Sequence, residues 1–156
     1  MAELSRWGDD HPDRLGGVWW EYTAEPKGSV KMCLGVIGDA AAVAAQVRPV
    51  LAHPDHLNVV AQRYTLRELR RLADIIFEDQ ITRWEALWES GRYASEEEFW
   101  RSVRESPVIV GADVNPEINK VGVGVAPRDS TFAAAVINRY GADRVHVFWE
   151  PIVTFW

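Results

Sequence analysis

The feature that most constrains the fold is a pattern that occurs twice along the chain. Leu34–Asp39 matches Val123–Asp129 with one insertion, and an alanine-rich stretch follows both. In each copy a strand ends at a turn, and the aspartate of that turn is suited to cap the helix that follows. We interpret the pattern as a degenerate duplication. The alternative is that any two segments of strand, strand, helix and strand look alike to this degree.

Each copy predicts a strand, a second strand, a helix and a third strand. The first copy has strands at 17–22, 30–37 and 57–61 and a helix at 40–51, and the second has strands at 108–114, 120–126 and 144–149 and a helix at 131–140. Thr65 and Glu68 form a capping box, which predicts that a mainly helical segment begins there and runs to about residue 105. The fold class expected is α+β, with two ββαβ-like lobes whose small sheets are mainly antiparallel.

These elements divide the chain into five expected parts. They are an N-terminal arm (1–15), a first lobe (16–63), a helical linker and insertion (64–106), a second lobe (107–150) and a C-terminal tail (151–156).

Charge and composition exclude several classes of function. The formal net charge is −6, and basic residues are interspersed with acidic ones, so we expect no nucleic-acid or membrane-surface partner. No apolar run reaches the roughly 20 residues of a membrane-spanning helix, and the N-terminus has no secretory leader pattern. One cysteine, Cys33, allows no intrachain disulfide. The cytoplasm is the expected location.

No catalytic constellation is expected. His53, Asp55 and His56 could contribute ligands to a zinc ion, but Pro54 between them favours an ordinary polar turn, and no metal or cofactor is expected. Cys33 lies in the middle of a predicted strand, where a thiol usually behaves as a small buried hydrophobe.

The eight tryptophans are the most unusual feature of the composition. Trp19 and Trp20 are adjacent in a strand and must face opposite sides of it, so one ring is either covered by a further element or presented to a partner. The segment after Glu150 is apolar and β-prone, and it must dock on its own sheet or on another protein. The expected partner-binding residues are Trp19, Trp20, Trp149, Ile152, Val153, Phe155 and Trp156.

A second interpretation is a small-ligand-binding protein or an enzyme, with an aromatic and carboxylate-lined pocket between the lobes. Glu21 and Asp113 occupy similar places on two leading strands and could form a carboxylate pair. Gly122 and Gly124 leave one face of a strand without side chains. We expect an aromatic ring from the Trp84–Trp100 segment to pack there, and the second alternative is a ligand. The residues of this alternative are Glu21, Trp84, Trp88, Trp100, Asp113, Gly122 and Gly124.

Five segments resemble the propeptide domains of bacterial chymotrypsin-like serine proteases, of the α-lytic protease and streptogrisin type. They are Gly17–Tyr22, Tyr64–Leu69, Gly111–Val114, Asn119–Val125 and Arg139–Val145. The resemblance implies two lobes that act as a folding template and inhibitor of the protease that follows them, with the second lobe binding by strand pairing and the last residues lying in the substrate cleft.

This sequence departs from that pattern because no protease follows the propeptide-like part and because Trp84, Trp88 and Trp100 lie in an insertion. We therefore expect a standalone relative, a non-catalytic protein that binds another protein or a second copy of itself. Protease inhibition is a further possibility that the resemblance leaves open.

Overall fold

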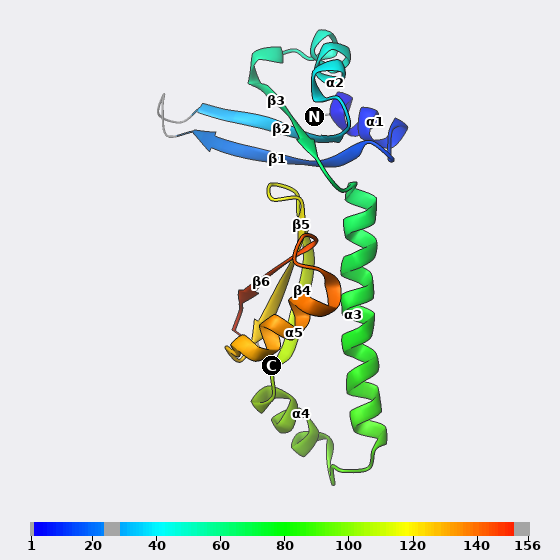
Figure 1. Cartoon of the computed structure of the whole chain (residues 1–156), viewed down its shortest axis with the longest axis vertical. Coiled ribbons are helices and arrows are strands. Elements are labelled where there is room, and N and C mark those ends of the chain that lie inside the picture. The colour runs from blue at the N-terminus through cyan, green and yellow to red at the C-terminus, as the bar shows by residue number, and fades with distance from the viewer. Residues whose placement is uncertain (1, 24–28, 152–156) are drawn as a thin grey trace. The chain divides into compact units, whose positions relative to one another are not determined.

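The computed structural model describes residues 2–23 and 29–151, and it has an α+β fold. The contacts divide the chain into two units (Figure 1). Unit 1 contains residues 1–69 and 115–119, and unit 2 contains residues 70–114 and 120–156. This division differs from the expected one, because the first 15 residues join unit 1 and a short turn from the second repeat also belongs to it.

Unit 1 is a three-stranded sheet with two helices. Its elements are α1 (Ala2–Asp10), β1 (Leu15–Thr23), β2 (Ser29–Ile37), α2 (Ala40–Val47) and β3 (Leu57–Gln62). The strand order is β1-β2-β3; β1 pairs with β2 in antiparallel and β2 with β3 in parallel orientation. A parallel pair requires a crossover, and α2 supplies it.

The N-terminal residues form part of the core of unit 1 and are not a separate arm. Leu4 of α1 is 1% exposed and packs with apolar residues of β2, α2 and β3. The fully enclosed members of this cluster are Leu4, Leu34, Val36, Val43, Val47 and Leu57.

The turn that connects two strands of the second repeat completes unit 1. Asn119 has a positive φ of 53° and uses its side-chain amide to bind the backbone just after β3. Gln62 donates a hydrogen bond to the carbonyl oxygen of Pro116 and accepts one from the Asn119 amide. The Pro116 ring lies directly over Gly17, whose φ is +148°. A side chain at Gly17 would collide with this ring.

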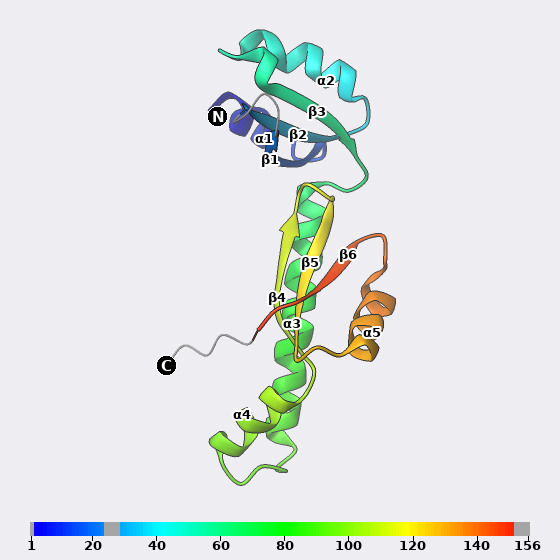
Figure 2. The same cartoon turned by 90° about the vertical axis from the view of Figure 1, so that its left-hand side faces the viewer.

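Unit 2 has a second three-stranded sheet and the remaining helices. Its elements are α3 (Leu66–Glu89, whose first turn belongs to unit 1), α4 (Glu96–Glu105), β4 (Val108–Asn115), β5 (Lys120–Ala126), α5 (Ser130–Tyr140) and β6 (Val145–Trp149). The strand order is β4-β5-β6, and β5 pairs with β6 in parallel, with α5 as the crossover (Figure 2).

Both repeats therefore have the same strand order and the same helical crossover. The predicted ββαβ order is confirmed for each. The expectation that the sheets are mainly antiparallel is wrong, because each sheet is mixed and its last two strands are parallel.

Polar side chains cap the helix starts, and the sequence predicts three of them, Thr65, Asp39 and Asp129. The Thr65 hydroxyl accepts from the Glu68 backbone N–H, and the Glu68 carboxylate accepts from the backbone N–H of Thr65, which completes the capping box. Hydrogen bonds from Thr65 lower the pKa of the Glu68 carboxyl. Asp39, Ser95 and Asp129 cap α2, α4 and α5.

Helix α3 buries one face. The spacing of apolar residues predicts that Leu69, Leu72, Ile75 and Ile76 lie on it. Leu69, Leu72, Ile76 and Gln80 are buried, whereas Ile75 is 42% exposed. None of the helices within residues 2–23 and 29–151 is long and apolar enough to cross a membrane.

Candidate functional site

The expected partner-binding tryptophans lie on the two sheets. Trp19 is opposite Cys33 and Trp20 is opposite Met32 across the β1–β2 pair, so the two rings are on opposite faces of unit 1. Trp19 is half-buried and Trp20 is 47% exposed. Trp149 ends β6 in unit 2 and is 38% exposed. Ile152, Val153, Phe155 and Trp156 lie outside the described residues.

The two carboxylates of the alternative pocket have separate local roles. Glu21, in unit 1, accepts a hydrogen bond from the Cys33 thiol (Sγ to Oε2, 3.5 Å). Burial of the thiol, and then this bond, raise the pKa of Cys33. Asp113, in unit 2, is exposed and accepts from the backbone N–H of Val114 (2.7 Å). Neither carboxylate lines either of the two pockets described below.

The three tryptophans of the alternative pocket belong to an aromatic cluster that joins α3 to α4. The Trp84 ring lies 5.9 Å from the Trp100 ring, and the Trp88 ring lies 5.3 Å from the Phe99 ring, both edge to face. Phe99 is buried at the centre of the cluster, and the Tyr93 ring also packs edge to face with it. These rings therefore hold the α3–α4 hairpin together, as aromatic core residues do.

The face of β5 at Gly122 and Gly124 is covered by side chains from the neighbouring strands of the same sheet and from the residue after β6. A side chain at Gly122 would meet the Phe148 ring at 3.2 Å, and one at Gly124 would meet the side chains of Glu150 and Val110. The prediction that a ring from the Trp84–Trp100 segment packs there is wrong. Phe148 and Glu150 are far from these glycines in sequence, and the β5–β6 register brings them together.

Unit 1 contains the same arrangement. The side chain of Gln62, the last residue of β3, lies across Gly16 of β1 and Gly35 of β2, and that of Glu150, directly after β6, lies near Gly111 of β4 and across Gly124 of β5. A polar side chain at the end of the third strand thus crosses a pair of glycines in both sheets, which supports the interpretation of the chain as a duplication.

Strand β6 forms one edge of the second sheet. Its neighbour is β5, and within the described residues no strand lies on its other side (Figure 2). The backbone N–H of Glu150 donates to the carbonyl oxygen of Val125 (3.1 Å), so the even-numbered residues of β6 direct their backbone groups toward β5. Val147 and Trp149 therefore direct theirs toward the outer edge.

A hollow of about 440 Å³ lies where β5 and β6 end. Its lining is mostly apolar and comes from residues 125–128 and 149–151. The Arg128 guanidinium lies over the Trp149 ring, 5.4 Å from its centroid. The hollow thus adjoins the end of the β6 edge.

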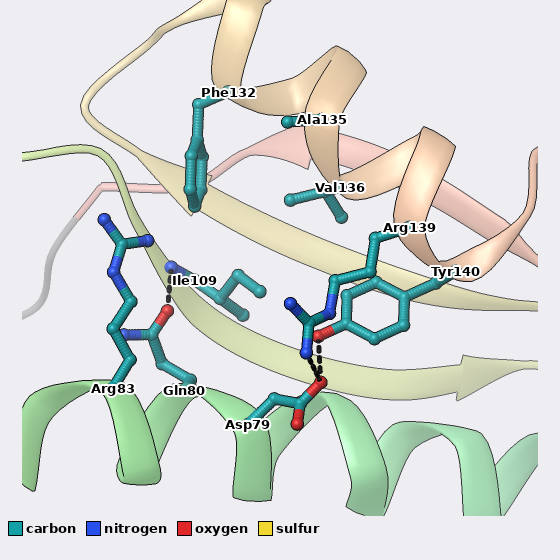
Figure 3. A pocket seen from close by; sticks show the side chains of 9 residues that line it. All are labelled: Asp79, Gln80, Arg83, Ile109, Phe132, Ala135, Val136, Arg139 and Tyr140. Atoms are coloured by element: carbon teal, nitrogen blue, oxygen red, sulfur yellow. Dashed lines mark hydrogen bonds and ion pairs between the residues drawn. The ribbon is translucent and has the colours of Figure 1, made fainter. Parts of the chain in front are cut away.

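A second pocket, of about 340 Å³, lies between α3, β4 and α5 (Figure 3). Ile109 of β4 forms its floor, and Phe132, Ala135 and Val136 of α5 form an apolar wall. The polar lining residues are Asp79, Gln80 and Arg83 of α3 and Arg139 and Tyr140 of α5.

One end of this pocket is closed by an ion pair and a tyrosine. Asp79 accepts hydrogen bonds from Arg139 (2.8 Å) and from the Tyr140 hydroxyl (2.7 Å). The bond from Tyr140, and after it the one from Arg139, lower the pKa of Asp79. Burial, and then the bond to Asp79, raise the pKa of Tyr140 to about 12. The hydroxyl therefore stays neutral and holds α5 against α3 at neutral pH.

The sequence pattern does not predict this pocket. Its available signal was Gln80, a polar residue at a position of the apolar face of α3, four residues after Ile76. In the structure Gln80 is 4% exposed and accepts a hydrogen bond from the Ile109 backbone N–H of β4 (3.3 Å).

The two histidines of the predicted polar turn are His53 and His56. The His53 and His56 rings lie 5.9 Å apart, and across residues 2–23 and 29–151 no group of three or more His, Cys, Asp or Glu side chains is placed to hold a metal ion. Compared with known proteins, the chain matches no family model and no curated protein.

Proposed function

We propose that this chain is a non-catalytic protein-binding module that works in the manner of a protease propeptide, through the outer edge of β6 and the C-terminal tail. The observation that carries the proposal is the open edge of β6. Within the described residues its outer backbone groups have no neighbouring strand, and Phe148 and Trp149 beside them are 40% and 38% exposed.

The composition of β6 supports strand addition. Natural proteins usually protect an exposed sheet edge with charged residues, proline or a bulge. Val145–Trp149 contains no Lys, Arg, Asp, Glu or Pro. An extended segment of a partner that added to this edge would bond to the outward backbone groups of Val147 and Trp149, and its side chains could reach the hollow beside Trp149.

The partner is another protein or a second copy of this chain, and the cytoplasm is the proposed location. The free, buried thiol of Cys33 is compatible with a reducing compartment. The net charge of −6 argues against a nucleic-acid partner.

The variant Val147→Pro tests the proposal at the edge itself. It removes one outward N–H, while the inward bonds of β6 come from its even-numbered residues, so the sheet should be retained. Val147→Thr is the matched control, because it keeps the N–H and the β-branched shape.

Two measurements read out the partner. Size-exclusion chromatography with light scattering detects self-association, and hydrolysis of a chromogenic peptide by a bacterial chymotrypsin-like protease detects inhibition. We expect wild type and Val147→Thr to give a response in one assay and Val147→Pro to lose it. A wild-type chain that remains monomeric and leaves the hydrolysis rate unchanged, or a response that Val147→Pro retains, contradicts the proposal.

A further inference from the structure

We propose that the pocket between α3, β4 and α5 binds a small organic carboxylate with a flat apolar body. The proposal rests on an unpaired buried donor, a guanidinium without a carboxylate partner and an apolar wall, all within unit 2.

The donor is the side-chain amide nitrogen of Gln80. Because the Ile109 backbone N–H must donate, the Gln80 atom that faces it is the oxygen, and the orientation of the amide is thereby fixed. The Nε2 atom is buried and has no hydrogen-bond partner in the described part of the chain. A buried donor without an acceptor is unfavourable, so an acceptor supplied by a ligand would be favourable there.

The positive charge comes from Arg83, one turn further along α3. Residues three apart lie on the same side of a helix, and Figure 3 shows the Gln80 and Arg83 side chains next to each other on one side of the pocket. The Arg83 guanidinium lies 5.7 Å from the centre of the Phe132 ring. Among residues 2–23 and 29–151 it forms no ion pair, whereas Arg139 at the other end is paired with Asp79.

The charge of the lining selects an anion. Two guanidinium groups and one carboxylate line the pocket, which leaves a formal charge of +1. A carboxylate has two acceptor oxygens, so it can receive hydrogen bonds from the forked guanidinium of Arg83 and from Gln80 Nε2 together. The polar end of the ligand therefore lies at Gln80 and Arg83.

The other walls determine the body of the ligand. Phe132 and Val136 from α5 face Ile109 across the pocket (Figure 3). A volume of about 340 Å³ is at the lower end of the range for ligand pockets, roughly 300–1,000 Å³. A single ring with one carboxylate attached suits these dimensions.

Titration of the isotope-labelled full chain with benzoate, followed by NMR in a buffer without other carboxylates or phosphate, tests the proposal. We expect benzoate to shift the side-chain amide signals of Gln80 and the backbone amide signal of Ile109. Benzamide, the neutral analogue, and acetate, which lacks the ring, should each bind at least about tenfold more weakly, because each lacks one of the two recognised features.

Two variants and a control assign the binding to this pocket. Arg83→Gln should weaken benzoate binding about tenfold or more by removing the charge. Gln80→Glu keeps an oxygen for Ile109 and replaces the donor with a second oxygen, so it should abolish binding. Arg70→Gln, at an exposed position of α3 outside the pocket, should bind as wild type does.

The proposal is overturned if benzoate leaves the Gln80 and Ile109 signals unchanged, if benzamide binds as tightly, or if Arg83→Gln binds benzoate as wild type does. Val147 does not line the pocket, so Val147→Pro should bind benzoate normally. This result separates the pocket from the function proposed for β6.

Discussion

The side-chain amide of Asn119 pairs with the backbone of Tyr64 in both directions. The Tyr64 N–H donates to Asn119 Oδ1 (2.8 Å), and Asn119 Nδ2 donates to the Tyr64 carbonyl oxygen (2.8 Å). The Arg63 N–H donates to the same Oδ1 atom (3.0 Å). The side-chain amide thus forms the pair of hydrogen bonds with Tyr64 that the backbone of a neighbouring strand would otherwise form.

Substitutions of Asn119 separate its hydrogen bonds from its backbone strain. Asn119→Gly keeps the positive φ and loses all four hydrogen bonds of the amide, and we expect the free energy of unfolding to fall by at least about 2 kcal/mol, from about 1 kcal/mol for each of the two bonds to Tyr64. Asn119→Ala adds the strain of a left-handed residue, about 1–2 kcal/mol more. Chemical denaturation at equilibrium measures both. Equal stabilities of the Gly and Ala variants would contradict the assignment of strain.

Gly17 and Gly38 form a matched pair for a test of close packing. Both have a positive φ, +148° and +91°, but a side chain at Gly17 would come within 2.6 Å of Pro116, whereas nothing lies within 4 Å of one at Gly38. Gly38→Ala should cost about 1–3 kcal/mol from strain alone, and Gly17→Ala should cost more.

The double variant Gly17→Ala with Pro116→Gly checks the source of this difference, because the atom nearest to a Gly17 side chain is the Cβ of Pro116, which an alanine would keep. Removal of the Pro116 ring should recover part of the loss, so the two substitutions should be non-additive in denaturation experiments. Strict additivity would show that Pro116 is not the obstacle.

The Tyr140–Asp79 bond predicts a dependence of stability on alkaline pH. Because the folded chain raises the Tyr140 pKa from its ordinary value of 10 to about 12, the contribution of the neutral hydroxyl is fully present below pH 10 and is lost as the pH rises toward 12. Tyr140→Phe should be about 1 kcal/mol less stable than wild type at neutral pH, and the gap should shrink above pH 10.

Denaturant midpoints measured at several pH values test this prediction. Tyr22→Phe is the control, because that side chain is 78% exposed. A gap between wild type and Tyr140→Phe that stays constant up to pH 12 would show that the Tyr140 hydroxyl does not titrate as described.

Neighbouring isoleucines of α3 test which face of the helix is buried. Ile76 is 0% exposed and Ile75 is 42% exposed. Ile76→Ala should cost about 2–5 kcal/mol through lost burial and the cavity that remains, and Ile75→Ala should cost less than about 1 kcal/mol. Thermal unfolding of the two variants side by side measures the difference, and similar losses would mean that both side chains are packed.

The elements that depend on local chemistry could be predicted from the sequence. Thr65, Asp39, Ser95 and Asp129 each place an oxygen next to the unpaired N–H groups of a helix start, and all four act as caps. The ββαβ order of each repeat also followed from the sequence. The parallel pairing was missed, although a helix between two adjacent strands of one sheet is the usual connection of a parallel pair.

The candidate sites depend on contacts that no local pattern encodes. Asp79 and Arg139 are 60 residues apart in the chain. Phe148 and Glu150 cover Gly122 and Gly124 through the register of β5 and β6, which is set when the sheet assembles. Gln80 was the one readable signal for the second pocket, since a buried polar residue requires a partner.

The turn that carries Asn119 has a consequence for synthesis on the ribosome. The first repeat is translated before the residues that complete its unit. The backbone of Tyr64 can bond to Asn119 only after a further 55 residues have been added to the chain. A fragment that stops before residue 119 would expose the end of β3, and a protease should cut it there more readily than in the finished protein.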